Sequence, residues 1–265
     1  SGKNGDQTVY SASGCKFEAD PNGDWEIDTL RTGCLGCVTV NLPRVAYESE
    51  KDKFFEVLRE RLEMASRALE IKFRAIKQHG KGLLPFITQN VNGEQYFRLD
   101  GSLRLINLIG LREAVEAFCG KSVREDEKVL KFAHEVAQQA SEFVHKAGKK
   151  HGKHLLVAAL PSFEVSERLA RLDIERFGVA KTRFSGTRDK PFYSAVNKAA
   201  VQEGKVCVEP LATEQKLREL DEGGQMTVVE LGENSLSADD LSAVTEQTVR
   251  NKSAEFLTYN RRLSY

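Results

Sequence analysis

Three of the five cysteines in this 265-residue chain, Cys15, Cys34 and Cys37, lie close together near its start. Clustered thiols can ligate a metal, exchange disulfides or act as nucleophiles. The segment Cys34-Leu-Gly-Cys37 fits half of a zinc site, a thioredoxin-like redox pair, or two thiols on a strand. A structural zinc site needs about four Cys or His ligands. Cys119 and Cys207 stand alone, and the five histidines show no matching spacing. We therefore predict no metal site within the chain.

The two thiols of the CxxC segment differ in the direction in which they are expected to point. A thioredoxin-type pair has its first cysteine at a helix N-terminus, whereas this segment runs into "VTVNL", which is typical of a strand. Residues three apart on a regular strand face opposite sides. We therefore expect at most one of Cys34 and Cys37 to face a given cavity.

Cys15 has a different setting, between the small residues of "YSASGCKF" and the polar stretch "EADPNGDWEID". Such a loop makes a poor core. A thiol placed there is either incidental or reactive.

The stretch "ALPSFEVSERLA" places Ser162 at a strand-to-helix turn, with Glu164 and Ser166 in the first helical turns. Ser162 could cap the helix. The free N–H groups of a helix start also suit a phosphate, so an anion site is the alternative. Gly223-Gly224 is expected to end a helix before a strand.

The elements that must position these residues alternate between apolar strands and helices. Strands are expected at "VTVNL", "LINLIGL", "HLLVAAL", "KVCVEP", "MTVVEL" and "EFLTYN". Helices are expected from Ser49 to Gly80, at "REAVEAFCG", from Ser122 to Lys150, and at "FEVSERLARLDIERFG", "TEQKLRELDEGG" and "SADDLSAVTEQTVRNK". This alternation is typical of parallel βαβ units with both sheet faces covered. The sequence therefore predicts an α/β fold.

The composition limits the kinds of binding partner and the cell compartment that we expect for this protein. Lys plus Arg and Asp plus Glu number 39 each, so no net field attracts nucleic acid or an anionic membrane. The longest apolar runs are far shorter than the roughly 20 residues that span a bilayer. A sparse, odd set of five cysteines favours a reducing, cytoplasmic location.

Several separated segments together resemble one known family. In chain order these are "SGC", "TGCLGCVTVNLPRVAYES", "NLIGLREAVEAFCG", "FEVSERLARLDIERFG", "SGTRDKPFYS", "LDEGGQMTVVEL" and "FLTYNRRLSY". They resemble the large subunit of the anaerobic (class III) ribonucleotide reductases, glycyl-radical enzymes that reduce ribonucleoside triphosphates to deoxyribonucleotides. The resemblance covers essentially the whole chain. It implies half of a ten-stranded α/β barrel, with parallel strands and helical crossovers, that carries the finger loop. Residues 1–265 would form this single half-barrel domain, with the finger loop at about 8–36.

The resemblance also implies roles for individual residues. Cys15 matches the position that carries the transient thiyl radical. Cys34 stands where the family usually has an asparagine, which suggests the subtype reduced by a redoxin. In that subtype this cysteine pairs with another on an earlier strand, outside the 265 residues, and Cys37 would be structural. The substrate triphosphate needs fixed donors, which a helix N-terminus at the end of a strand can supply, so we expect it at Ser162, Glu164 and Ser166.

The cofactors and partners implied by the resemblance lie outside the chain. The family's glycyl radical and structural zinc belong to a later segment, and an iron–sulfur, S-adenosylmethionine-dependent activase generates the radical. A thioredoxin-like or glutaredoxin-like reductant and a homodimeric complete enzyme are also expected. The chain would then be a fragment that is inactive alone. Two alternatives are a non-catalytic α/β binding or assembly module derived from this fold, and another glycyl-radical enzyme.

Overall fold

The computed structural model describes residues 8–20, 22–50, 52–123, 126–151, 154–194, 198–202, 205–208, 222–231, 237–250 and 256–260. A three-stranded parallel sheet lies at its centre, with strand order β3-β6-β7. Its strands are β3 (Cys34–Asn41), β6 (Leu103–Ile109) and β7 (Leu155–Ala158). Each was expected from a short apolar run, which suits strands buried on both faces.

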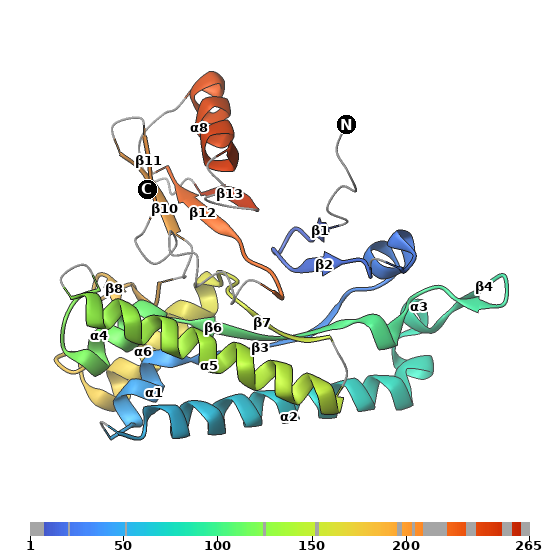
Figure 1. Ribbon diagram of the computed structural model, residues 1–265, viewed down its shortest axis with the longest axis horizontal. Coiled ribbons are helices and arrows are strands. Elements are labelled where there is room, and N and C mark those ends of the chain that lie inside the picture. Colours follow the sequence, from blue (N-terminus) through green and yellow to red (C-terminus); the bar gives the residue numbers. More distant parts are fainter. Residues whose placement is uncertain are drawn as a thin grey trace.

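Helical crossovers join these strands. The helices are α1 (Leu42–Glu48), α2 (Phe54–Leu83), α4 (Leu111–Cys119), α5 (Glu127–His151) and α6 (Phe163–Phe177). Figure 1 shows α2 and α5 running along one side of the sheet, and the hairpin of β1 and β2 on the other. Four of the five helices were predicted, and α4 ends at Gly120 as expected, with a left-handed φ of 72°. The short helix α1 was not predicted. Pro43 lies in its first turn, where its fixed φ favours a helix start.

Alternate residues of β6 point to opposite faces of the sheet. On the outer face, Ile106 and Leu108 pack into the main core with residues of α2, α4 and α5. On the other face, Leu103 and Leu105 form a smaller cluster that includes Cys15. We call this second side the inner face. It is the side on which the loop that carries Cys15 lies.

A second sheet has the strand order β11-β10-β12-β13. Its elements are β10 (Lys198–Gln202), β11 (Lys205–Val208), β12 (Thr227–Glu230) and β13 (Leu257–Asn260), with helix α8 (Ala238–Arg250) between the last two strands. β10, β12 and β13 are parallel, whereas β11 pairs with β10 in an antiparallel hairpin. The sequence did not indicate β10. Most of the expected helix "TEQKLRELDEGG" lies outside the described residues.

The two sheets are joined by a parallel bridge between Ala159, which follows β7, and Gln225, which precedes β12. Shorter elements complete the described fold. They are β1 (Thr8–Tyr10), β2 (Lys16–Glu18), η1 (Glu26–Leu30), α3 (Pro85–Thr88), β4 (Asn90–Val91), β5 (Glu94–Gln95), η2 (Leu99–Gly101), β8 (Ser185–Gly186) and β9 (Pro191–Phe192). In the described ranges, no helix is both long and apolar enough to cross a membrane.

Candidate functional site

Cys15 lies at the turn between β1 and β2, and it is buried, with 5% of its surface exposed. Its backbone N–H donates to the hydroxyl of Ser11 at 3.1 Å, and the hydroxyl of Ser13 lies 3.4 Å from its sulfur. Leu103, Leu105 and other inner-face residues pack around it. The small residues that make "YSASGC" a poor core thus let the turn fold tightly around one buried thiol.

A pair of glycines holds this turn against the second sheet. Cys15 forms an antiparallel bridge with Gly224, and the N–H of Lys16 donates to the carbonyl of Gly223 at 3.1 Å. A Cβ atom on Gly224 would lie 2.1 Å from the carbonyl oxygen of Gly14 and 2.9 Å from Cα of Cys15. Gly223-Gly224, which the sequence indicated only as a helix end, is therefore the surface on which the thiol loop rests.

Cys34 and Cys37 lie on β3, beside the same inner-face leucines. Cys34 pairs with Leu103 and Cys37 pairs with Leu105, because the register shifts by one residue between Cys34 and Gly36. Leu103 and Leu105 are two residues apart and face the same side. The expectation that Cys34 and Cys37 face opposite sides is therefore wrong. It assumed a regular strand, and a β-bulge changes the alternation.

The three thiols interact electrostatically. The hydrogen bond from Cys34 lowers the pKa of Cys15, and Ser13 and Ser11 act in the same direction while burial opposes them. The same hydrogen bond raises the pKa of Cys34 well above the usual thiol range, and burial adds to this rise. Burial, followed by the charge on Cys15, raises the pKa of Cys37 to about 11. The direction of these shifts favours the thiolate form at Cys15 and the thiol form at Cys34 and Cys37.

Asn107 connects the inner face to the start of α6. Its amide nitrogen donates to the carbonyl of Leu160 at 3.0 Å, and its amide oxygen accepts the N–H of Leu160 at 2.7 Å. Both bonds are buried, so the turn after β7 is held firmly above the sheet. This turn delivers Ser162 to the N-terminus of α6.

The three residues expected at the triphosphate have different environments. Ser162 is partly buried, and within the described residues its side chain makes no capping bond to α6, contrary to the simple N-cap interpretation. Glu164 is exposed in the first turn. Ser166 is buried, and its hydroxyl donates to the carbonyl of Tyr193 at 2.6 Å. Of the three, Ser162 has the side chain best placed to meet a ligand at the helix start.

A buried carboxylate, Asp173 of α6, ties together the elements at the carboxyl end of β3. It is fully buried. Its oxygens accept from the amide of Asn41 at 2.8 Å, the Nε of Arg44 at 2.6 Å and the hydroxyl of Tyr193 at 2.6 Å. Burial, with the bond to Asp173 acting in the same direction, raises the pKa of Tyr193. The network fixes α1, α6 and the segment after β9 relative to one another.

A second buried carboxylate, Glu113, connects the elements at the carboxyl end of β6. It lies in the first turn of α4 and is 2% exposed. It accepts from the hydroxyl of Ser194 at 2.8 Å, the hydroxyl of Ser185 at 2.9 Å and Arg112 at 3.2 Å. The hairpin of β8 and β9 is thereby held against α4.

Sequence reasoning missed Asn107, Asp173 and Glu113 as positioning residues. Asn107 could have been found, because it is a polar residue inside the continuous apolar run "LINLI". Asp173 and Glu113 lie in helices rich in charged residues, and nothing local marks them as buried.

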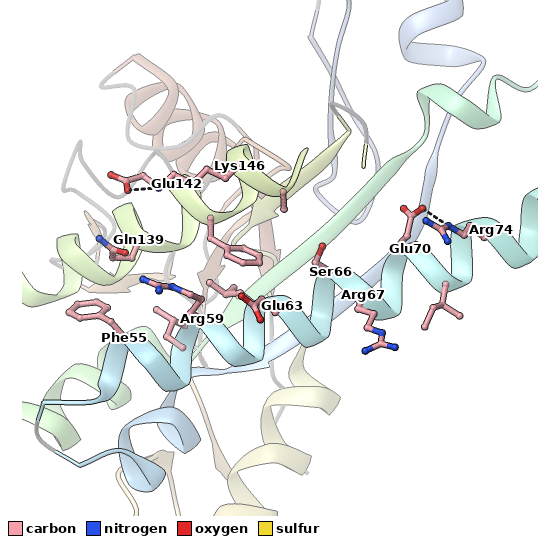
Figure 2. Close-up of a pocket in the computed structure, with 15 residues that line it drawn as sticks. Phe55, Arg59, Glu63, Ser66, Arg67, Glu70, Arg74, Gln139, Glu142 and Lys146 are labelled. Carbon is pink, nitrogen blue, oxygen red and sulfur yellow. Dashed lines mark hydrogen bonds and ion pairs between the residues drawn. The ribbon is translucent and has the colours of Figure 1, made fainter. Parts of the chain in front are cut away.

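A groove of about 890 Å³ lies on the opposite side of the sheet, between α2 and α5. Figure 2 shows its walls, with Glu70 paired to Arg74 on α2 and Glu142 paired to Lys146 on α5. Glu70 also pairs with the buried Arg104 at 2.9 Å, which anchors α2 to β6. The groove is thus separated from the cysteines by the sheet. Within the described ranges, no group of three or more His, Cys, Asp or Glu side chains could hold a metal ion.

Fold and site together define part of an α/β barrel with thiols on its inner face. The family model described as anaerobic ribonucleoside-triphosphate reductase matches residues 2–265. The chain therefore belongs to the anaerobic ribonucleoside-triphosphate reductase family.

Curated relatives and solved structures agree with this assignment. The chain is 27% identical over 172 residues to the anaerobic ribonucleoside-triphosphate reductase of Haemophilus influenzae, covering 60% of this chain and 24% of the relative. It is 23% identical over 235 residues to that of Enterobacteria phage T4, covering 82% of this chain and 36% of the relative. The chain thus spans only about a quarter to a third of these relatives.

The fold is that of a solved anaerobic ribonucleotide reductase. The Thermotoga maritima enzyme in complex with dATP and CTP matches with a TM-score of 0.62 and 20% identity, over 84% of this chain and 36% of that one. The same enzyme with MES in the active site matches with a TM-score of 0.64 and 21% identity, over 86% and 37%. The α/β half-barrel expectation agrees with this likeness.

Proposed function

We propose that this chain is the part of an anaerobic ribonucleotide reductase that carries the radical thiol and reduces ribonucleoside triphosphates to deoxyribonucleoside triphosphates. The observation that supports it most directly is the placement of Cys15. Its sulfur is buried on the inner face, Cys34 lowers its pKa, and the loop that carries it forms a bridge with Gly224. Such fixed placement suits a thiol that must meet one atom of a bound substrate.

In the proposed reaction Cys15, as a thiyl, removes the 3′-hydrogen of the ribose and returns it at the end. A glycyl radical outside residues 1–265, generated by an iron–sulfur, S-adenosylmethionine-dependent activase, supplies the oxidising equivalent. Burial of Cys15 protects the thiyl from water and oxygen. Cys34, whose pKa is raised by its interaction with Cys15, donates reducing equivalents as one thiol of a pair.

The triphosphate is proposed to lie at the start of α6. The first N–H groups of a helix have no partner within it and favour anions. The N-terminus of α6 follows β7 directly, and Asn107 holds the intervening turn. Ser162 would donate to a phosphate oxygen, Glu164 would border the site, and Ser166 would support it through its bond to Tyr193. We propose no metal on these residues.

The complete enzyme is proposed to be a cytoplasmic homodimer that a thioredoxin-like or glutaredoxin-like protein reduces again after each turnover. Such a protein would reduce the oxidised pair by thiol–disulfide exchange.

Replacing Cys15 tests the proposal. In the complete, radical-bearing enzyme, Cys15→Ala should abolish turnover of ribonucleoside triphosphates while nucleotide binding, measured by equilibrium dialysis, stays intact. The matched control is Cys119→Ala, since Cys119 lies exposed at the end of α4. Turnover retained by Cys15→Ala would exclude the thiyl role.

A further inference from the structure

If the chain acts in ribonucleotide reduction as proposed above, the sulfur of Cys15 must keep one position both as a thiol and as a thiyl. A cysteine side chain can rotate about its Cα–Cβ bond, and its S–H bond can rotate as well. Burial alone therefore does not fix the direction of the S–H bond. Two serine hydroxyls, those of Ser11 and Ser13, lie in the same turn and contact this residue.

Ser11, Ser13 and Cys15 are joined in a ring of hydrogen bonds. The backbone N–H of Cys15 donates to the hydroxyl oxygen of Ser11 at 3.1 Å. The two hydroxyl oxygens lie 2.9 Å apart, and the hydroxyl oxygen of Ser13 lies 3.4 Å from the sulfur. Because Ser11 already accepts a hydrogen bond, its own hydroxyl hydrogen is available to donate to Ser13. Ser13 then has its hydroxyl hydrogen for the sulfur.

The electrostatics of the thiol agree with this direction of donation. A hydrogen bond donated to a sulfur stabilises the thiolate and lowers the pKa. Cys34 has the largest lowering effect on the pKa of Cys15, burial opposes it, and Ser13 and then Ser11 lower the pKa further. Ser13 is therefore the donor to the sulfur, and the S–H hydrogen points away from Ser13.

The backbone of the turn closes without the side chain of Ser13. The N–H of Gly14 donates to the carbonyl of Ser11 at 2.9 Å, and the N–H of Ser11 donates to the carbonyl of Cys15 at 3.0 Å. In the part of the chain that the structure describes, the side chain of Ser13 hydrogen-bonds only to Ser11 and Cys15. Ser11 therefore supports the turn, whereas the hydroxyl of Ser13 acts on the sulfur.

We propose that Ser13 is a positioning residue for hydrogen-atom transfer at Cys15. Its hydroxyl holds the sulfur from one side in the thiol and thiyl forms and directs the S–H bond away from itself, toward the bound ribose. In the forward transfer the C3′–H bond breaks and an S–H bond forms, and the reverse transfer returns the hydrogen atom. Ser13 gives up no proton and no electron in either step.

Removal of the Ser13 hydroxyl should change the pH dependence of the reaction. Only the thiol form of Cys15 carries a hydrogen atom, so activity falls as the pH rises through the pKa of this residue. Without the donor this pKa rises, and the fall in activity moves to higher pH. The substitution leaves unchanged the neighbouring titratable groups, which include the β3 thiols and a β2 ion pair: Cys34, Cys37, Lys16 and Glu18.

Steady-state turnover of a ribonucleoside triphosphate by the complete, radical-bearing enzyme tests the role of Ser13. Because a misplacement of about 1 Å costs about 10²-fold in rate, Ser13→Ala should lower kcat at least about tenfold below the pH of the fall, with KM unchanged. The fall in kcat should move to higher pH. Ser13→Thr keeps the hydroxyl and should restore most of the lost kcat. Ser237→Ala removes an exposed hydroxyl directly before α8 and should match the wild type.

Amide hydrogen exchange separates positioning of the sulfur from a structural role in the turn. The N–H groups of Cys15 and Lys16 donate to Ser11 and Gly223. Exchange of the peptide that contains them should be unchanged in Ser13→Ala and faster in Ser11→Ala.

The outcomes distinguish this inference from the proposed function. Faster exchange in Ser13→Ala, failure of Ser13→Thr to restore kcat, or a wild-type kcat and pH profile in Ser13→Ala would overturn the inference and leave the reductase function intact. Turnover retained by Cys15→Ala would overturn the proposed function, and the inference with it.

Discussion

Adding one methyl group at Gly224 should release the loop that holds Cys15. The Cβ of Gly224→Ala would lie 2.1 Å from the carbonyl oxygen of Gly14, 2.7 Å from the N–H nitrogen of Lys16 and 2.9 Å from Cα of Cys15. All three are backbone atoms, so rotating a side chain cannot relieve the contact. Gly224 also has φ of 121°, a conformation that residues with a Cβ rarely adopt.

The expected cost follows from these two features. Overpacking in a well-filled region costs about 1–3 kcal/mol, and a left-handed backbone adds about 1–2 kcal/mol for a residue with a Cβ. The free energy of the docked loop should therefore rise by about 2–5 kcal/mol relative to the undocked loop. The ratio of undocked to docked loop then increases by about 30-fold to several-thousand-fold. The hairpin of β1 and β2 can move away, so the loop should undock while the main core stays folded.

The assay is the rate at which Cys15 is alkylated, followed peptide by peptide with isotope-coded reagent and mass spectrometry. Because Cys15 is buried, it reacts mainly when the loop opens. The alkylation rate of Cys15 should rise in Gly224→Ala by the same factor as the population of the undocked loop, up to the point at which the undocked loop predominates. Turnover of the complete enzyme should fall correspondingly.

Gly82→Ala is the matched control. Gly82 lies in α2 and its Cβ would meet no atom within 4 Å, so the substitution should leave Cys15 protected and should stabilise the helix by about 1 kcal/mol. An unchanged alkylation rate of Cys15 in Gly224→Ala would refute the claim that Gly224 positions the thiol.

Further substitutions test the buried network around Asp173 and the interaction between Cys34 and Cys15. Asp173→Ala leaves Asn41, Arg44 and the buried Tyr193 without their acceptor, and it should lower the free energy of unfolding in urea by about 3–5 kcal/mol. Asp189→Ala, at the exposed tip of the β8–β9 hairpin, should stay within about 0.5 kcal/mol of the wild type, and equal losses in the two would contradict the network. Cys34 lowers the pKa of Cys15. In Cys34→Ala the ultraviolet absorbance of the Cys15 thiolate should therefore appear at higher pH than in the wild type. In Cys15→Ala this absorbance step should be absent. A titration unchanged by Cys34→Ala would mean that the hydrogen bond does not control Cys15.

The elements of the fold were largely predictable from local sequence. The apolar run at β6 and the glycine that ends α4 are short-range signals, and these elements, like α5 and α6, formed where they were expected. Alternation of apolar strands and helices likewise predicted the parallel sheet. By contrast, β10 gave no clear signal, because its hairpin with β11 depends on pairing rather than on hydrophobic pattern.

The candidate thiols were also visible in the sequence, since cysteine chemistry depends on residue type and the loop around Cys15 has an unusual composition. The neighbours that set their properties were not visible. Gly224 lies more than two hundred positions along the chain from Cys15, and only folding brings them into a bridge. The burial of Asp173 likewise depends on Asn41, Arg44 and Tyr193 from two other segments.

The sequence by itself determined which residues could do chemistry and which segments would be helix or strand, because both follow from side-chain type and short-range periodicity. Tertiary structure alone decided which way each thiol faces. A shift of one residue between β3 and β6 moves Cys34 and Cys37 to the same side. That shift arises where Gly36 packs closely against α2, a contact between segments that no local pattern contains.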